Sequence, residues 1–342
     1  MSISLVTGGS GFIGQHLVGE LIAAGEDVRV LDLEPPARED ANVTFIRGGV
    51  TDTRLVREAM EGVSHLYHAA ALSDLWIADP RMFQEVNVVG TRIVLEAALK
   101  AGVERVVHTS SATVLIDRRI GRRPTTLDET FETGEKGLAG AYARSKWWAE
   151  KVATGFMDKM PIVIVLPTLP LGPGDRRLTP PSRMLQGFLS GKIGAYVDCI
   201  LNLIDVRAAA VGHRLACARG RPGQRYILNN HSLEMSSFLQ CLQRLTGRPM
   251  PTWRVPATAA LVASAAMEFW SNQVSGRMPL APLAGTRTSL QPVSFDGRLA
   301  QVELGLPITP VATTLNDAIV WLARTGHLPE EVEKTILAAN GD

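Results

Sequence analysis

The stretch SLVTGGSGFIGQHLV, residues 4–18, joins an apolar run to a helical pattern. The run at residues 3–6 is typical of a short buried strand, and the apolar spacing from residue 12 onward predicts a helix that ends at Gly25. Glycine stands at positions 8, 11 and 14 of this junction, although glycine weakens both helices and strands. A tight strand-to-helix turn needs backbone conformations that glycine adopts without strain, so we expect a strand, a tight turn and a helix here.

The same turn has the composition of an anion-binding site. A backbone without Cβ atoms can approach a bulky anion, and the N–H groups and positive dipole end of the new helix then face a pyrophosphate. A second predicted strand, at residues 27–33, carries Asp32 18 residues after Gly14. A dinucleotide-binding fold places there the carboxylate that holds the adenine-ribose hydroxyls. The context predicts a nucleotide site, with a plain glycine-rich turn as the alternative.

Charge and cysteine content narrow the classes of partner. The 342 residues include 35 basic and 34 acidic side chains, and this balance gives no electrostatic case for nucleic acid or an anionic membrane. Cys199, Cys217 and Cys241 are odd in number and lack the spacing of metal ligands, so no metal site is expected. They suit a reducing cytoplasm, where they would serve as small buried hydrophobic residues.

The apolar segments predict a protein without a membrane span. The first apolar run is itself the strand before the glycine turn, so we expect no signal peptide and a cytoplasmic protein. The later segment ATAALVASAAM, residues 257–267, is too short to cross a bilayer. Core packing is its favoured role, and lining an apolar pocket or resting on a membrane surface are the alternatives.

Strand and helix patterns alternate over the first 170 residues, which predicts a parallel sheet covered on both faces. We therefore expect an α/β fold: a Rossmann-type, doubly wound parallel sheet with a smaller, mostly helical C-terminal substrate-binding region. Residues 1–170 would form the cofactor-binding domain, with residues 195–230 returning to it. Residues 171–194 and 231–342 would bind the substrate.

A tyrosine and a lysine share one face of a predicted helix. The motif YARSK places Tyr142 and Lys146 four residues apart. A tyrosine normally ionises near pH ~10, and a neighbouring ammonium group is expected to lower that pKa. The pair would then move a hydroxyl proton during hydride transfer, whereas an exposed surface pair is the alternative.

Polar and small residues follow two other predicted strands. Thr109, Ser110 and Ser111 come at the carboxyl end of one strand, where open α/β sheets bind ligands. A serine hydroxyl there can hydrogen-bond a substrate oxygen. Ala69 and Ala70 end an earlier strand and leave room for a cofactor.

With these motifs in place, the chain resembles an extended short-chain dehydrogenase/reductase of the NAD-dependent epimerase/dehydratase family. Within it, the chain is most similar to dihydroflavonol-reductase-like proteins, and DLWIADP, NVVGT and AYVDCILNLI are similar to the hopanoid-associated sugar epimerase proteins. The resemblance runs nearly end to end, through the motifs TGGSGFIG, GVTD, HAAA, NVVGT, HTSSATV, YARSK, LPTLPLGPGD, LNLIDVRAAAVGH, RYIL and LNDAIVWL.

The resemblance implies roles for individual residues. Tyr142 would be the catalytic acid/base, Lys146 would bind the nicotinamide ribose, and Ser111 would orient the substrate oxygen. Asn87 matches the family asparagine that supports the active-site helix. The implied cofactor-binding residues are Gly8, Gly11, Phe12, Ile13, Gly14, Asp32, Val50, Ala69, Ala70, Lys146 and Pro167.

The same resemblance implies the cofactor and the assembly. Asp32 would repel a 2′-phosphate, and no arginine follows it directly, so NAD is expected rather than NADP. Gly49, before Val50, stands where the family usually has an acidic residue that meets the adenine. Relatives commonly form homodimers through a four-helix face, so a homodimer is expected by analogy.

The segment LPTLPLGPGD, residues 166–175, bears on the substrate. Nucleotide-sugar epimerases carry an asparagine in the corresponding segment, and this chain has none there. That pattern is more like the reductases and hydroxysteroid dehydrogenases, so we expect an NAD-dependent oxidoreductase that interconverts a secondary alcohol and a ketone on an apolar or amphiphilic molecule. An NAD-dependent sugar epimerase or dehydratase is the alternative, and a non-catalytic NAD-sensing module is the third hypothesis. Arg176, Arg177 and Arg183 would border the substrate, and His68 and His108 are expected to be structural.

Overall fold

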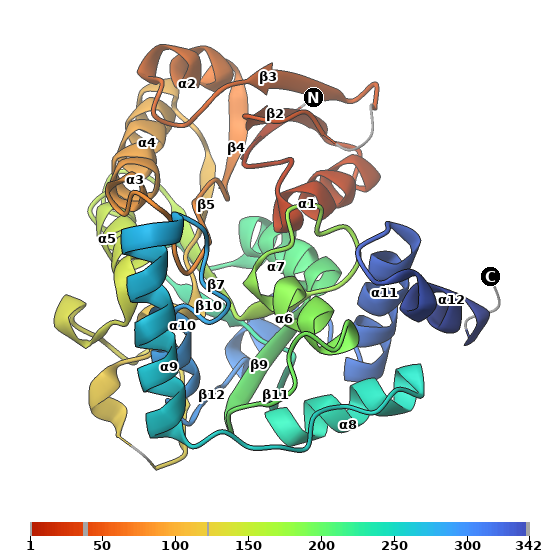
Figure 1. Cartoon of the computed structure of the whole chain (residues 1–342). Helices are drawn as coiled ribbons and strands as arrows, with labels where there is room; N and C mark the ends of the chain where they lie inside the picture. Colours follow the sequence, from red (N-terminus) through yellow and green to blue (C-terminus); the bar gives the residue numbers. More distant parts are fainter. Residues whose placement is uncertain (1, 37–39, 122, 340–342) are drawn as a thin grey trace.

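A seven-stranded parallel sheet forms the centre of the computed structural model, which describes residues 2–36, 40–121 and 123–339 (Figure 1). The strand order is β10-β7-β5-β4-β1-β2-β3. The chain therefore leaves β1 toward one edge and later crosses back to build the other half from β4. The strands are β1 (Ile3–Thr7), β2 (Asp27–Asp32), β3 (Val43–Arg47), β4 (Val63–His68), β5 (Arg105–Thr109), β7 (Ile162–Pro167) and β10 (Arg225–Leu228). The expected Rossmann-type doubly wound fold is confirmed.

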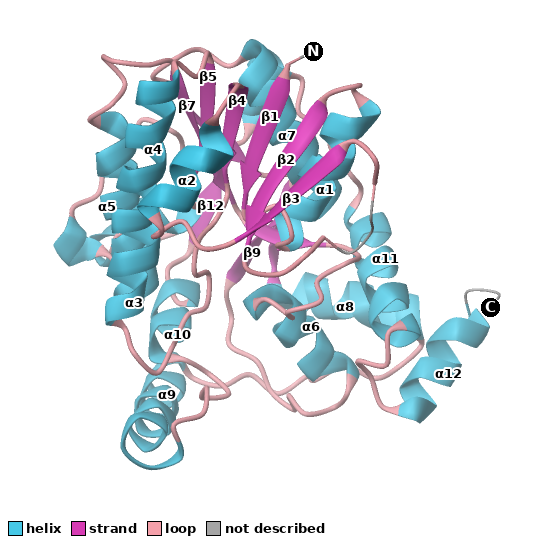
Figure 2. Ribbon diagram, turned by 90° about the horizontal axis from the view of Figure 1, so that it is seen from above, coloured by secondary structure: helices cyan, strands magenta, loops and turns pink. Residues whose placement is uncertain are grey.

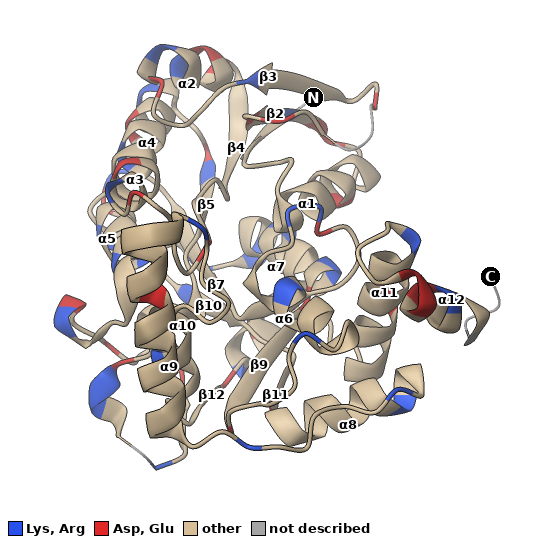
Figure 3. Ribbon diagram, in the orientation of Figure 1, with Lys and Arg blue, Asp and Glu red and all other residues tan. Residues whose placement is uncertain are grey.

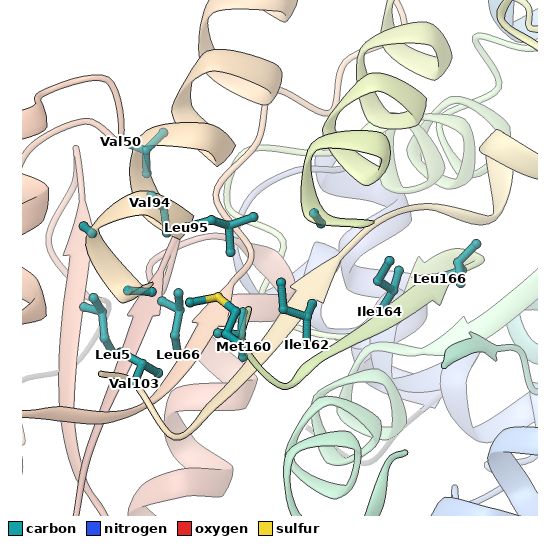
Figure 4. Close-up of a cluster of buried hydrophobic side chains, with 14 of the residues drawn as sticks. Leu5, Val50, Leu66, Val94, Leu95, Val103, Met160, Ile162, Ile164 and Leu166 are labelled. Carbon is teal, nitrogen blue, oxygen red and sulfur yellow. The ribbon is translucent and has the colours of Figure 1, made fainter. Parts of the chain in front are cut away.

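Helices cover both faces of this sheet (Figure 2). Successive residues of a strand point to opposite faces, so Leu5 packs into one core and Val6 into the other. Helices α1 (Phe12–Ala23) and α7 (Val206–Arg219) cover the side of Val6. On the side of Leu5 lie α2 (Thr53–Met60), α4 (Gly90–Ala101) and α5 (Gly140–Thr154). Figure 4 shows this second core, in which the side chains of Leu5, Leu66 and Ile162 from three strands meet Val94 and Leu95 of α4.

A second group of elements packs around a smaller core beside the sheet. Strand β9 (Ile200–Asp205) pairs in parallel with β8 (Leu169–Leu171) and antiparallel with β11 (His231–Glu234). Their apolar side chains pack with Leu185, Phe238 and Leu315. The helices of this group are α6 (Pro180–Leu189), α8 (Met235–Thr246), α11 (Val311–Arg324) and α12 (Glu330–Ala339). Strand β10 is part of the large sheet and α7 packs on that sheet, whereas β9 lies in the small sheet. The expected division of the chain into two domains at residue 170 remains a prediction.

Shorter elements connect these two groups. Strand β12 (Val293–Phe295) pairs in parallel with β6 (Thr125–Leu127), and α9 (Ala257–Trp270) packs beside α10 (Leu283–Ser289) (Figure 1). The remaining short helical elements are α3 (Arg81–Phe83), η1 (Gln84–Val89), η2 (Ala112–Leu115), η3 (Arg118–Ile120), η4 (Glu135–Gly137), η5 (Ser271–Ser275) and η6 (Ala300–Leu304).

Two expectations for single segments have different outcomes. The core position favoured for residues 257–267 is wrong: α9 buries only Ala260 and Ser264, because one narrow stripe of the helix meets α10. Cys217 and Cys241 are buried as expected, and Cys199 is half-buried. No helix among the described residues is both long and apolar enough to cross a membrane.

The turn between β1 and α1 requires glycine for two different reasons. Gly8 has a φ of 73°, in the left-handed region, and a Cβ there would lie 2.7 Å from the backbone of Ala70. A Cβ on Gly14 would lie 2.0 Å from the carbonyl oxygen of Gly8. The first turn of α1 thus presses against the end of β1, and neither position has room for a side chain.

Substitution by alanine at two glycines of α1 tests this packing. We expect Gly14→Ala to destabilise the protein by about 3 kcal/mol or more, because backbone atoms must move to admit the methyl group. Gly19 is exposed on the same helix and has no atom within 4 Å of an added Cβ, so Gly19→Ala should stabilise the helix by roughly 0.5–1 kcal/mol. Urea unfolding of both variants measures the difference, and equal stabilities would contradict the packing.

Candidate active site

A cavity of about 610 Å³ lies along the carboxyl edge of the large sheet. Its wall is built from the segments that follow β1, β2, β4, β5 and β7, and from residues of the second group of elements. Ten of the expected site residues line it: Gly8, Gly11, Phe12, Ile13, Gly14, Ala69, Ser111, Tyr142, Lys146 and Pro167. Five strand ends that are distant in sequence therefore meet in one space, at the switch point where open α/β sheets bind ligands.

The end of the cavity at α1 has the features of a phosphate site. Helix α1 begins after Gly11 without a side-chain cap, so its first N–H groups keep no side-chain partner. The hydroxyl of Ser10 is buried and likewise has no hydrogen-bond partner among the residues that the structure describes. Free N–H groups, the positive end of the helix dipole and an unpaired hydroxyl together fit an anion such as the pyrophosphate of NAD.

Asp32 is turned toward the backbone around it. One carboxylate oxygen accepts the N–H of Ser10 at 3.0 Å, and the other accepts the N–H of Leu33 at 2.7 Å. The side chain thus holds the glycine turn in place, and a carboxylate oxygen can accept a second hydrogen bond. Asp32 does not line the cavity, whereas Glu34, two residues later, does. The role of Asp32 at an adenine ribose remains a prediction.

Val50 and Ala70 also lie outside the cavity wall. Val50 is buried against the first residue of α4, because a Cβ on Gly90 would lie 2.6 Å from its methyl group. The backbone of Ala70 meets Gly8, and its N–H approaches the hydroxyl of Thr7 at 3.4 Å. Both residues shape the sheet edge beneath the cavity, and their contact with a cofactor remains a prediction.

Ser111, Tyr142 and Lys146 all line the cavity. Ser111 follows β5, while Tyr142 and Lys146 face the same space from successive turns of α5. Ser111 is a hydrogen-bonding neighbour that acts to lower the pKa of the Tyr142 phenol. The Ser111 hydroxyl accepts a hydrogen bond from the Thr113 hydroxyl at 2.9 Å.

The expectation that Lys146 lowers the pKa of Tyr142 is wrong for the protein chain by itself. Burial raises the pKa of Tyr142 above that of an ordinary tyrosine, and the hydrogen bond with Ser111 opposes this only in part. Lys146 instead donates to the backbone carbonyl of Thr109 at 2.6 Å. The phenol is therefore held in its protonated form, ready to donate a hydrogen bond.

Lys146 is itself perturbed by burial. The side chain is 4% exposed, and desolvation lowers its pKa to about 8, while the charge of Glu150 acts in the opposite direction. Glu150 lies one turn further along α5 and accepts hydrogen bonds from Ser110 and, at 3.1 Å, from Arg225. This network was not identified from the sequence, and the spacing of Tyr142, Lys146 and Glu150 on one helix face was its only signal.

Asn87 supports the helix that carries the tyrosine, as expected. Its amide donates to the Ser145 hydroxyl at 2.9 Å and to the Leu72 carbonyl at 3.0 Å, and its carbonyl accepts the Leu72 N–H. The asparagine thus joins α5 to the segment after β4, which lines the cavity.

The buried histidines have structural surroundings. His68 shares hydrogen bonds with Thr7 at 2.7 Å and Thr91 at 2.9 Å, and burial lowers its pKa to about 3. His108 packs against His68 across the paired strands, with ring centroids 5.5 Å apart, and burial also lowers its pKa. Both rings are neutral and absent from the cavity wall. No cluster of possible metal ligands occurs among the described residues.

The rest of the cavity lining is mixed: apolar side chains lie there together with arginines and with polar residues such as Asp74, Asn202 and Gln291. Arg183 pairs with Asp74 at 2.6 Å, and Arg176 and Arg177 line the same region. Arg176 and Arg177 lie in the loop after β8, whereas Arg183 lies on α6. This loop is tied to α1, because Gln15 donates to the Gly174 carbonyl at 2.6 Å. The apolar side chains in the lining include Leu75, Ile116, Leu169, Pro170, Ile200, Leu201, Val293 and Phe295.

Comparison with known proteins identifies the family of this chain. Residues 4–201 match the model of the NAD dependent epimerase/dehydratase family. A putative dihydroflavonol 4-reductase of Synechocystis is 37% identical over 94% of this chain and 95% of its own length. Sterol demethylase protein B of Methylococcus capsulatus is 31% identical over 95% and 99%, respectively. Among solved structures, that of gox2253 superposes with a TM-score of 0.82 at 30% identity and covers 96% of this chain and all of its own. The chain belongs to the NAD-dependent epimerase/dehydratase family of enzymes, within the extended short-chain dehydrogenases/reductases.

Proposed function

We propose that the protein is an NAD-dependent oxidoreductase that interconverts a secondary alcohol and a ketone on an apolar or amphiphilic molecule. The observation that carries this proposal is that Ser111, Tyr142 and Lys146 line one cavity together with a group of apolar side chains that includes Leu169, Ile200 and Phe295. Hydrogen-bonding groups beside apolar side chains suit a molecule that has an oxygen and a hydrophobic body.

The glycine turn is proposed to hold the pyrophosphate of NAD. The uncapped start of α1 and the unpartnered hydroxyl of Ser10 support this. Asp32 and Glu34 place negative charge beside the expected adenine-ribose position, which favours NAD over a 2′-phosphorylated cofactor. When bound, NAD supplies or accepts the hydride of the reaction.

The substrate oxygen is proposed to lie between Ser111 and Tyr142. Ser111 orients the oxygen through its hydroxyl, and the buried phenol of Tyr142 donates its proton to a carbonyl oxygen that gains negative charge. In the reverse direction the same phenolate takes the proton of the alcohol. Lys146, held by the carbonyl of Thr109, is proposed to bind the nicotinamide ribose.

The composition of residues 166–175 is an argument for an apolar substrate. This segment has prolines and a threonine where a sugar-binding segment would supply an amide, and Leu169 and Pro170 line the cavity. A relative that shares almost the whole chain length is named for a sterol, which is the same chemical class.

A sugar epimerase or dehydratase is the second candidate, because Arg176, Arg177 and Arg183 border the cavity. Three guanidinium groups are suited to the diphosphate of a nucleotide sugar. The ion pair with Asp74 already engages Arg183 and makes it less available to an anion. The presence of Tyr142 and Lys146 in the cavity disfavours a non-catalytic sensor of NAD.

The expected homodimer would use α4 and α5, which expose Leu99 and Trp148.

The amount of NAD retained on purification distinguishes the two candidates. An epimerase returns hydride to its substrate and keeps its cofactor, whereas a dehydrogenase exchanges cofactor in every cycle. We expect the protein, purified without added cofactor and then denatured, to release far less than one NAD per chain. Chromatography of the released nucleotides measures this, and near-stoichiometric NAD would favour the epimerase instead.

Replacement of the phenol tests the proton transfer. We expect Tyr142→Phe to lower kcat for ketone reduction by about 10²–10⁴-fold, while the dissociation constant of NADH stays nearly unchanged. Tyr196→Phe is the control, because the hydroxyl of this buried tyrosine bonds to Arg254 and the residue does not line the cavity. Absorbance of NADH follows turnover, and an unchanged kcat for Tyr142→Phe would contradict the assignment.

Stability against pH tests the state of Lys146. Its pKa falls from 10.5 to about 8 on folding, so between these values the unfolded chain binds more protons than the native one. The contribution of Lys146 to the free energy of unfolding therefore rises with pH between these two values. Relative to Lys146→Met, the wild type should gain about 1–3 kcal/mol in urea unfolding between pH 7.5 and 10.5. Lys151→Met, on the exposed side of α5, is the control; a flat difference for Lys146→Met would disprove the burial effect.

A further inference from the structure

Helix α9 exposes an apolar surface that no described part of the chain covers. Its exposed residues are alanines with Val262, Phe269 and Trp270, and Thr258 is the only polar one. Val274, Met278 and Leu280 follow the helix and are exposed as well. We call these six large side chains (Val262, Phe269, Trp270, Val274, Met278 and Leu280) the α9 surface. Phe269 and Leu280 are 67% and 73% exposed, which is unusual for side chains that cluster in one region.

The α9 surface is also hollowed. A second cavity of about 460 Å³ lies between α9 and the segment that follows it. Trp270, Met278 and Leu280 line this cavity together with small residues, and no charged side chain does. An open apolar hollow beside exposed aromatic rings fits a hydrocarbon chain.

Basic residues outnumber acidic ones in the stretch of sequence that contains this surface. Between Glu234 and Asp296 the chain has five arginines, no lysine and a single carboxylate, Glu268. Glu268 accepts the N–H of Leu283 at 2.8 Å and so caps α10. Arg277 and Arg287 are exposed and form no ion pair with the described residues. Figure 3 shows α9 with almost no charge along its length.

We propose that the α9 surface docks the enzyme on the face of an anionic phospholipid bilayer. Phe269 and Trp270 would enter the boundary between headgroups and acyl chains, while Arg277 and Arg287 would meet lipid phosphates. The helix lies along the bilayer rather than across it, because its 14 residues rise only about 21 Å.

A second copy of the chain fits this surface less well. Two identical copies meet through the same patch, which would bring Arg277 and Arg287 of each copy near those of the other without a carboxylate between them. A bilayer with anionic headgroups instead supplies both the apolar interior and the opposite charge.

Docking at this place would bring the bilayer close to the active-site cavity. The Ser264 hydroxyl bonds the Thr286 hydroxyl at 2.7 Å, so α9 and α10 are joined, and Thr288, Ser289 and Gln291 at the end of α10 line the cavity. Trp76, in the segment after β4, donates to Asn272 at 2.9 Å. An amphiphilic substrate could therefore pass from the lipid to Tyr142; this part of the inference rests on the proposed function.

Sedimentation with lipid vesicles tests the docking directly. The full chain is mixed with vesicles of phosphatidylglycerol and phosphatidylcholine, or of phosphatidylcholine alone. We expect the protein to sediment with the anionic vesicles, less with the neutral ones, and less again as salt is raised. Absence of binding to the anionic vesicles at low salt would overturn the proposal.

Two pairs of variants separate the apolar and charged contributions. Phe269→Ser with Trp270→Ser should weaken vesicle binding by at least about tenfold. Val302→Ser with Ile308→Ser, also exposed but outside the α9 surface, should leave binding unchanged. Thermal unfolding checks that each variant is folded. Equal losses in both pairs would show general hydrophobic adsorption and overturn the proposal.

The charge variants are the single substitutions Arg277→Ala and Arg287→Ala. Each substitution should weaken binding to anionic vesicles by about fivefold and make that binding less dependent on salt. The control substitutions Arg57→Ala and Lys100→Ala each remove a positive charge from α2 or α4 and should not change vesicle binding.

Sedimentation equilibrium tests whether the α9 surface is instead a subunit contact. If the wild type is a dimer that does not bind vesicles, and the Phe269/Trp270 variant is a monomer, the surface is a subunit contact and the proposal fails.

Activity measurements keep this inference distinct from the proposed function. On a short, water-soluble ketone the Phe269/Trp270 variant should be as active as the wild type, whereas on a ketone embedded in vesicles it should lose at least about tenfold. Vesicle binding without ketone reduction would refute the oxidoreductase and leave the docking intact. Equal rates of the two proteins on the embedded ketone would refute delivery from the bilayer.

Discussion

The contact between the first turn of α1 and the end of β1 is the constraint on which the site depends. Gly14 lies so close to the Gly8 carbonyl that no side chain fits between them, and Gly8 meets the backbone of Ala70 in the same way. This packing places the uncapped start of a helix at the point where the order of the strands reverses. The helix dipole and its free N–H groups therefore face the cavity, and Asp32 fixes the turn through the N–H of Ser10.

Burial then sets the proton chemistry. Tyr142 and Lys146 face the cavity from one side of α5, and desolvation favours the neutral form of each. The carboxylate of Glu150 opposes that effect at Lys146, and Asn87 fixes the helix through Ser145. The site is thus a protonated phenol beside a lysine held by a backbone carbonyl, an arrangement suited to donating a proton to a carbonyl oxygen.

The second half of the chain supplies the character of the substrate wall. Leu169, Ile200 and Phe295 come from three separate elements and add apolar side chains to the cavity lining, and Thr288 and Ser289 of α10 also line the cavity. Helix α10 is joined in turn to the exposed helix α9 through Thr286 and Ser264. That continuity connects the proposed amphiphilic substrate with the proposed lipid surface.

The sequence by itself determined the parallel sheet, the glycine turn and the shared helix face of Tyr142 and Lys146, because these depend on local spacing: strand and helix periods, and two residues one helical turn apart. Ser111 and Asn87 followed from family resemblance. The tertiary structure alone decided the raised pKa of Tyr142, the link from Lys146 to Thr109 and the exposure of α9. Each of these depends on what lies next to a side chain after folding. Desolvation is a property of the whole packed environment, and an apolar run is equally compatible with a core and with a surface until its neighbours are in place.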